Sequence, residues 1–215
     1  MSELYNAWTG HLVRLRAVEP GDWERFAAFD QDSEGQRRGY HLTLPRSAQR
    51  AQAWAKEQAE RQPDPANDNY GWAIDVIARG DIDGDGEGVA GHLNVHGADR
   101  LNANFEYGIT LGADHRGKGY AADALKILLR HYFDELRYHR VSGIVYAFNE
   151  PSQRFHEKFG FTLEGRLREY HYSAGQLHDV LWYGMTAPQF WARYPELRTG
   201  PHPGVYPPQP PLAER

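Results

Sequence analysis

The sequence predicts an α+β fold, a single domain whose mixed central β-sheet is flanked by helices. Strand-like and helix-like patterns follow one another in the order β-α-α-β-β-β-α-β-α-β-β, with no internal repeat. Residues 141–148 form a nearly continuous apolar run, as a buried central strand should. The 215 residues, 40% hydrophobic and 13% aromatic, are enough for one sizeable core. We expect this domain to span residues 1–190 and a Pro-rich extended tail to span 191–215.

The first half of the chain is expected to hold short strands and two helices. Glu19-Pro20-Gly21-Asp22 opens the first helix, whose apolar positions include Trp23, Phe26 and Phe29. Pro63 stops the second helix, because proline cannot continue the helical hydrogen bonding. The expected elements are a strand at 12–15, a helix ending at 29, an irregular polar loop at 30–46, a helix at 47–62, a strand at 72–78, a Gly/Asp turn at 80–88 and a strand at 89–96.

In the second half, alternate residues of a strand at 105–111 are expected to face the core, which leaves Glu106 on the opposite face. The core-facing set is Phe105, Tyr107, Ile109 and Leu111. The following helix has an apolar stripe of period 3.6 from Ala121 to Leu136. The remaining expected elements are a strand at 141–148, a helix at 149–159 and a hairpin of strands 166–172 and 177–185 around a turn at 173–176.

Composition excludes several classes of function. Without cysteine, the chain has no disulfide, no thiolate zinc site and no cysteine nucleophile. A net charge of −5 argues against general nucleic-acid binding. Residues 1–20 lack the features of a signal peptide, and no window approaches the about 18 apolar residues of a membrane span. We expect a soluble, cytoplasmic protein that binds neither nucleic acid nor membrane; a homodimer is compatible with this.

A Gly-rich loop, Arg116-Gly117-Lys118-Gly119-Tyr120-Ala121, lies between a strand and a helix. The first N–H groups of a helix have no intrahelical partner, and glycine lets a phosphate approach them closely. Lys118 and the helix dipole add favourable charge, so the loop is an anion cradle suited to a pyrophosphate. A P-loop NTPase is one interpretation of residues 112–119, but Gly119 has no hydroxyl to hold magnesium, and the next apolar strand ends in Asn149 in place of a carboxylate.

Two blocks of sequence resemble the GNAT N-acetyltransferase superfamily. Arg116, Gly119 and Ala121 fill the family's acetyl-CoA loop, R/Q-x-x-G-x-G/A. Residues 149–161, NEPSQRFHEKFGF, resemble the signature N-x-x-S/A-x-x-x-Y-E-K-x-G-F. Residues 164–180 look like the corresponding part of ribosomal-protein N-terminal alanine acetyltransferases and spermidine acetyltransferases. The resemblance implies a single GNAT-type domain with acetyl-CoA-dependent N-acetyltransferase activity.

The resemblance also implies a set of cofactor-binding residues. Backbone groups of 109–111 would pair with the pantetheine arm, the amides of 116–121 would hold the pyrophosphate, and two residues of the second block would contact the arm near the thiol. The implied set is Ile109, Thr110, Leu111, Arg116, Gly117, Lys118, Gly119, Tyr120, Ala121, Asn149 and Ser152. The acceptor would be an amine of a protein N-terminus, a polyamine or a small molecule.

Acetyl transfer to an amine needs a group that accepts a proton. A primary amine of pKa ~10.4 is mostly charged at pH 7, and presenting its neutral form costs roughly 4.6 kcal/mol. Glu106 on the cofactor-binding strand is the expected base, because related enzymes carry Glu there, and amides of that strand would stabilise the oxyanion. His156 stands where the family has its acid Tyr, and we expect it to protonate the leaving thiolate or to serve as a packing residue.

Other patterns give weaker evidence of function. Asp81-x-Asp83-x-Asp85-Gly86 imitates the start of a calcium loop, but the twelfth position is His92 in place of Glu, so a hairpin turn is expected. The pairs His92/His96 and His171/His178 lack a third clustered ligand, so no metal site is expected. The competing function is a non-catalytic acyl-CoA-binding or sensing protein that has kept the cradle and lost the acid.

Overall fold

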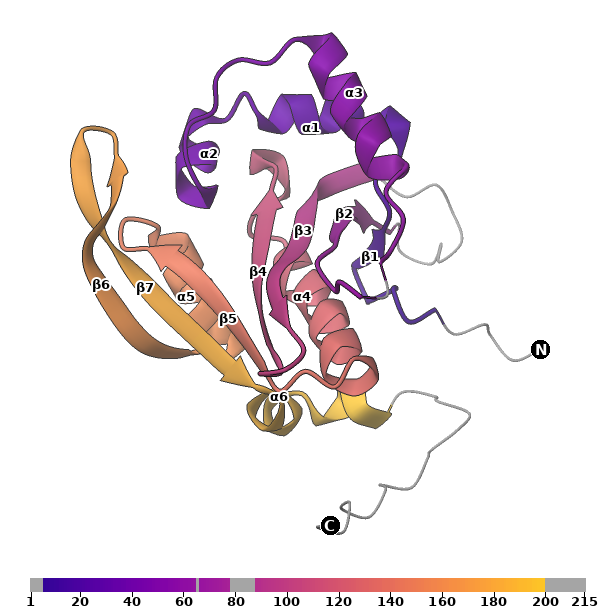
Figure 1. Cartoon of the computed structure of the whole chain (residues 1–215), viewed down its shortest axis with the longest axis vertical. Helices are drawn as coiled ribbons and strands as arrows, with labels where there is room; N and C mark the ends of the chain where they lie inside the picture. Colours follow the sequence, from indigo (N-terminus) through magenta and orange to yellow (C-terminus); the bar gives the residue numbers. More distant parts are fainter. Residues whose placement is uncertain (1–5, 65, 78–87, 200–215) are drawn as a thin grey trace.

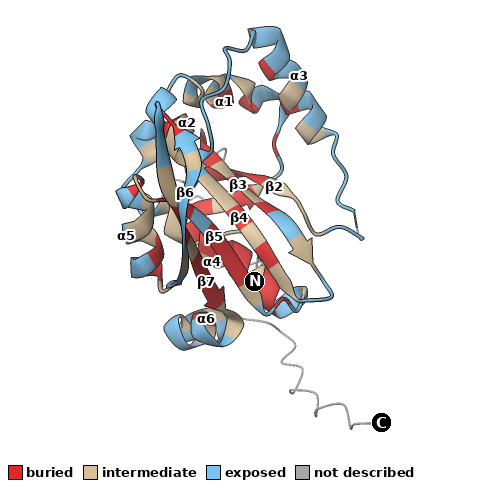
Figure 2. Ribbon diagram, turned by 60° about the vertical axis from the view of Figure 1, so that its left-hand side comes forward, coloured by how far each residue is buried: buried red, intermediate tan, exposed pale blue. Residues whose placement is uncertain are grey.

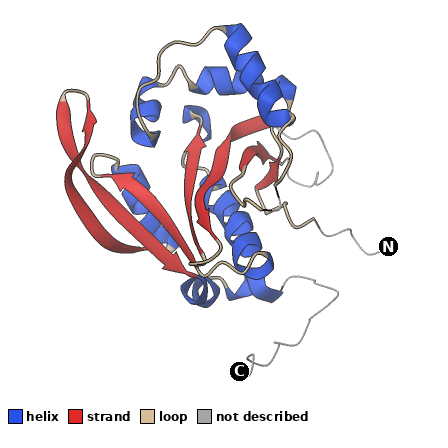
Figure 3. Cartoon of the chain, in the orientation of Figure 1, coloured by secondary structure: helices blue, strands red, loops and turns tan. Residues whose placement is uncertain are grey.

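The computed structural model describes residues 6–64, 66–77 and 88–199, and its centre is a seven-stranded sheet (Figures 1 and 3). The strand order is β1-β2-β3-β4-β5-β7-β6. The strands are β1 (Val13–Arg16), β2 (Gly71–Val76), β3 (Gly88–Asp99), β4 (Asn104–Leu111), β5 (Arg140–Tyr146), β6 (Thr162–Ser173) and β7 (Gln176–Thr186). Only β4 and β5 pair in parallel, while the other neighbours are antiparallel. The predicted mixed sheet is therefore confirmed.

Six α-helices accompany the sheet in the described part of the chain. They are α1 (Trp23–Phe29), α2 (Ser33–Gly39), α3 (Ala48–Ala59), α4 (Tyr120–Arg130), α5 (Glu150–Phe159) and α6 (Ala187–Arg193). A π-helical turn, His131–Glu135, continues α4 and brings Tyr132 into the core. The hairpin β6–β7 closes through Ala174 and Gly175, whose φ values of 51° and 83° match the turns that join twisted strands.

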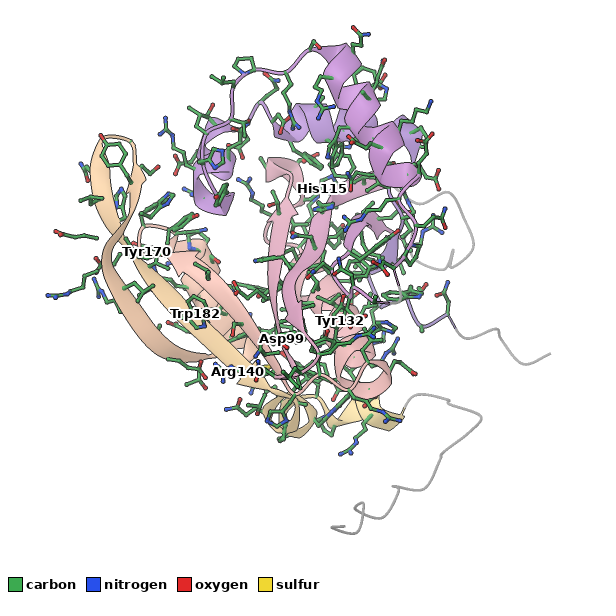
Figure 4. All side chains as sticks on the ribbon, in the orientation of Figure 1. Asp99, His115, Tyr132, Arg140, Tyr170 and Trp182 are labelled. Atoms are coloured by element: carbon green, nitrogen blue, oxygen red, sulfur yellow. The ribbon has the colours of Figure 1, made fainter. Side chains whose placement is uncertain are left out.

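The sheet buries its two faces in two separate clusters. The larger cluster lies under α4 and α5 and includes Phe105, Leu125 and Tyr132, the last labelled in Figure 4. The smaller cluster joins Phe26 of α1 and Ala55 of α3 to β2 and β3. Figure 2 shows the buried residues concentrated along the central strands. This rigid support holds the ends of β4 and β5 and the start of α4 in fixed positions.

The parallel pairing of β4 with β5 is short. It joins only Asn104 to Arg140, Phe105 to Val141 and Glu106 to Ser142. Beyond these pairs the two strands separate, as Figure 1 shows. The sheet thus opens at its middle, between the C-terminal end of β4 and that of β5.

The structure corrects three expectations about local structure. Residues 30–46 were expected to be an irregular loop, but α2 lies within them, begun by Asp32, whose carboxylate accepts the N–H of Gly35. Residues 187–193 form α6, which crosses the expected domain boundary at 190, and Pro195–Thr199 form a 3-10 turn where an extended tail was expected. The Asp81–Gly86 motif and tail residues 200–215 lie outside the described residues.

Candidate active site

A pocket of about 240 Å³ lies where β4 separates from β5. Its walls come from the end of β4, the loop before α4, the start of α5 and one side of α2. Eight of the residues expected to bind the cofactor line it, namely Ile109, Thr110, Leu111, Arg116, Gly117, Ala121, Asn149 and Ser152. The fold therefore brings together two sequence blocks that are separated by the whole of α4 and β5.

The loop before α4 presents backbone groups to this pocket. Gly117 and Gly119 have φ values of 75° and 89°, a conformation that side chains disfavour. A Cβ at Gly117 would meet no atom within 4 Å, so the space in front of this loop is open. Gly119 precedes the first residue of α4, whose initial N–H groups have no partner within the helix. Such an opening suits a phosphate group.

A second pocket of about 590 Å³ continues the first between α4 and α5. The two pockets share Leu111, Gly117, Ala121, Pro151 and Phe155. The second is lined by Gly119 and by four basic side chains, Lys126, Arg154, Lys158 and Arg193. Among the expected cofactor residues, Lys118 and Tyr120 line neither pocket, and Tyr120 packs against the larger core cluster. The two pockets form one continuous space, and basic side chains are more numerous in the second.

Helix α2 bridges the two sides of the first pocket. At its start, Asp32 accepts a hydrogen bond from the guanidinium of Arg116 at 2.7 Å. The backbone N–H of Gly35 and the charge of Arg116 lower the pKa of Asp32. Near its end, the side-chain amide of Asn149 donates to the carbonyl of Arg38 at 3.1 Å. These contacts tie α2 to the loop before α4 on one side and to the start of α5 on the other.

The sequence analysis missed the α2 residues that line the pocket, Gly35, Arg38 and Gly39. The sequence nevertheless contains a signal for the start of α2. Asp32 followed by Ser33 and Glu34 is a typical helix start, with a capping side chain and an acidic first turn. The helix is short and polar, so its apolar periodicity gives no sign of it.

His156 lies in the interior, with 4% of its surface exposed. Its Nδ1 hydrogen bonds to the carbonyl oxygen of Ser152 at 2.8 Å, and because a carbonyl only accepts, Nδ1 carries the proton. Nε2 is then an acceptor, and the hydroxyl of Tyr107 donates to it at 2.9 Å. Burial lowers the pKa of His156 to about 4, so the imidazole is neutral at pH 7. The neutral Nε2 has no proton to transfer.

The expected base, Glu106, lies beside the last pair that joins β4 to β5. Its carboxylate is 3.6 Å from Nε2 of His96 on β3, and its side chain is 30% exposed. Glu106 does not line the first pocket. Its register partner is Ser142, while its neighbours Phe105 and Tyr107 face the core. The carboxylate therefore stands at the base of the opening, on the sheet face opposite the core.

The described part of the chain also bears on membrane insertion and metal binding. Within the described ranges, no helix is long and apolar enough to cross a membrane. Among the same residues, no three His, Asp or Glu side chains are grouped to hold a metal ion.

Comparisons with known proteins agree with this geometry. The family model described as Acetyltransferase (GNAT) domain matches residues 13–162. The SPbeta prophage-derived uncharacterized N-acetyltransferase YokL of Bacillus subtilis is 35% identical over 184 residues, 85% of this chain and 94% of that protein. Spermidine N(1)-acetyltransferase of Escherichia coli K12 is 27% identical over 100 residues, 46% of this chain and 53% of that protein.

Solved structures share the fold. Spermidine N-acetyltransferase from Vibrio cholerae, in complex with CoA and spermine, matches with a TM-score of 0.67 at 18% identity and covers 83% of this chain and 97% of that chain. The family match spans most of the described sheet and both of the sequence blocks that meet at the first pocket, up to Thr162. The chain belongs to the GNAT family and is an acetyltransferase.

Proposed function

We propose that this enzyme transfers the acetyl group of acetyl-CoA to a primary amine while both substrates are bound. The observation that carries the proposal is the convergence of the β4 end, the α4 start and the α5 start on one pocket. A Vibrio cholerae relative in fold binds CoA and spermine, which supports both halves of the proposal. When bound, acetyl-CoA supplies an activated acyl group and a thiolate leaving group.

The residues of the two pockets fit a long molecule with a polyanionic end. Backbone groups of Ile109, Thr110 and Leu111 lie along a strand edge that has lost its β5 partner, so they can bind amide groups. The glycine loop before α4 offers N–H groups to a pyrophosphate. The four basic side chains of the second pocket would compensate further phosphate charge. Asn149 and Ser152 would contact the arm in the first pocket.

Glu106 is the group we assign as the base. To lose its proton at pH 7, an amine of pKa ~10.4 needs roughly 4.6 kcal/mol, and the α-amine of a polypeptide, of pKa ~8, needs roughly 1 kcal/mol. A carboxylate held near the amine accepts that proton directly or through a water. The side chain is partly exposed at the base of the opening, where an acceptor can reach it.

For His156 we propose a positioning role in place of acid catalysis. Its neutral ring accepts the hydrogen bond of Tyr107 and fixes α5 against β4. A thiolate resembling cysteine, with pKa ~8.5, is a good leaving group, so its protonation by solvent requires little help.

The test of this function is the Glu106→Gln variant. We expect unchanged affinity for acetyl-CoA in calorimetry and a loss of about 10²–10⁴-fold in kcat/KM with a panel of amines, because a positioned base contributes about that much. Glu57→Gln, on the exposed surface of α3, is the matched control and should retain full activity. A loss of only a few-fold would remove Glu106 from the catalytic machinery.

Acetyl-CoA binding is tested separately by thermal unfolding. A ligand present at 100 times its Kd stabilises the native state by about 2.7 kcal/mol, so acetyl-CoA should raise Tm while ATP with magnesium should not. Stabilisation without turnover of any amine would favour a sensing protein over the proposed enzyme.

A further inference from the structure

The strand register places Glu106 on one face with a row of apolar side chains. Residues that pair across strands point to the same face, and alternate residues along each strand do likewise. Glu106 pairs with Ser142, and Ile144, two residues further along β5, pairs with Trp182 of β7. On the edge strand β6, Leu167 pairs with Val180 of β7. Glu106, Ile144, Trp182 and Leu167 therefore share the face that lies opposite α5.

We call Ile144, Trp182 and Leu167 the apolar patch. Ile144 is 44% exposed and Leu167 is 40% exposed, and Trp182, labelled in Figure 4, is partly exposed. Figure 1 shows α5 on the opposite side of β5 and β7 from this face. Single exposed apolar residues are ordinary, but a contiguous group over three neighbouring strands indicates a binding surface.

The charges around the patch restrict what it can bind. At the end of the patch where β5 begins, Arg140 forms an ion pair with Glu164, so these two charges neutralise each other. A polyamine carries several separated positive charges and needs several free carboxylates. Among the described residues, the carboxylate of Glu106 has His96 as its ion-pair partner and no arginine or lysine, and it lies next to apolar side chains.

The position of the cofactor pocket restricts the approach of the acceptor. This step rests on the proposed function. The pocket is lined by Ala121 of α4 and by Ser152 and Phe155 of α5, all on the side of the sheet that α4 and α5 cover, and α2 contributes a further wall. An amine that reaches Glu106 must come from the opposite face. The remainder of the acceptor then lies on the apolar patch.

We propose that the apolar patch binds a bulky apolar group of the acceptor. Trp182 is two strands and two residues away from Glu106, about 12 Å by the spacings of a sheet. An extended peptide advances about 3.3 Å per residue, so its fourth side chain would reach the patch when its N-terminal amine is at Glu106. The acceptor is a polypeptide N-terminus with an aromatic or large aliphatic residue at the fourth position.

The experiment compares two peptides, Ser-Gly-Gly-Phe and Ser-Gly-Gly-Ser, with spermidine as a third acceptor. We expect the phenylalanine peptide to have about tenfold higher kcat/KM, expressed mainly in KM, because burying part of a ring contributes that much. Trp182→Ala and Ile144→Thr should reduce the preference to about twofold or less. Leu163→Thr is the matched control, since Leu163 is 51% exposed on the other face of β6 and should leave the preference intact.

Circular dichroism and sedimentation of each variant separate recognition from folding and assembly. The conservative Ile144→Thr change retains the strand preference of a β-branched residue, so it tests the patch even where Trp182→Ala unfolds the hairpin. Equal rates for the two peptides, or a higher rate with spermidine, would overturn this inference alone. A native dimer that Ile144→Thr dissociates, with no peptide preference, would assign the patch to contacts between copies. Absence of turnover with every amine would overturn the proposed function as well.

Discussion

Changing His156 to Phe should reveal a buried neutral imidazole through the pH dependence of stability. In the native protein the ring accepts the hydroxyl of Tyr107 and donates to the carbonyl of Ser152. Phenylalanine fills the space but leaves both groups without that partner. At pH 7.5 the variant should lose about 1–3 kcal/mol of unfolding free energy, the usual cost of unsatisfied buried polar groups.

The loss should shrink as the pH falls. Burial holds the pKa of His156 at about 4, against an ordinary value of 6.5, so between these values the unfolded chain binds more protons than the folded one. The contribution of the neutral ring is complete above pH 6.5 and declines as the pH falls toward 4. At pH 5 the native protein has lost about 2 kcal/mol through this group alone, and the variant has lost none of it.

Urea unfolding at pH 7.5 and at pH 5 measures the difference. The free-energy gap between native protein and His156→Phe should close by about 2 kcal/mol at pH 5. Other groups that titrate in this range, such as His92, whose burial also lowers its pKa to about 4, are common to both proteins and cancel. His139→Gln, at an exposed position, should show the native profile. A gap that is the same at both pH values would refute the neutral buried ring and reopen an acid role for His156.

Three further predictions follow from contacts around the pocket. Gly119→Val forces a β-branched side chain into a φ of 89° in front of α4, so calorimetry should detect no binding of acetyl-CoA. The control Gly21→Ala, at a position with open space around it, should bind acetyl-CoA normally. Asp123→Leu removes the carboxylate that accepts the N–H groups of Leu12 and Val13, so urea unfolding should show a loss of about 2–4 kcal/mol; a loss below 1 kcal/mol would contradict this. Asp32→Ala removes both the α2 cap and the Arg116 contact, so hydrogen exchange in α2 should accelerate. The acceleration should be smaller in Asp32→Asn, which retains a capping oxygen.

Much of the sheet and the cofactor pocket could be predicted because strong local patterns specify them. The alternation from Phe105 to Leu111 sets which side of β4 enters the core, and the structure confirms it. The glycine loop and the Asn149 block are recognisable in isolation, and the sheet brings them to one pocket. The regular spacing of apolar residues from Ala121 onward likewise predicts α4, although Ala121 itself lines the pocket.

The elements that sequence reasoning missed depend on few buried residues. Helix α2 buries only Gly35, so its apolar periodicity is absent, and its place is fixed by Asp32 and Asn149, which lie far apart in the chain. Helix α6 buries only Phe190. In the sequence, Pro188 indicates the end of an element, whereas in the structure it lies in the first turn of α6, which Thr186 caps. The neutral state of His156 depends on its burial, to which residues far away in the sequence, such as Tyr107 on β4, contribute. Such long-range contacts cannot be read from local patterns.

The short ladder between β4 and β5 has a mechanical consequence. Three residue pairs join the two halves of the sheet, and β5 offers no strand partner to residues 107–111. A ligand carrying amide groups of its own can act there as a removable strand that completes the sheet. Hydrogen exchange at 107–111 would then slow upon binding, while exchange at 104–106, already paired, would not change. On the proposed function, acetyl-CoA would complete the central sheet of the enzyme that consumes it.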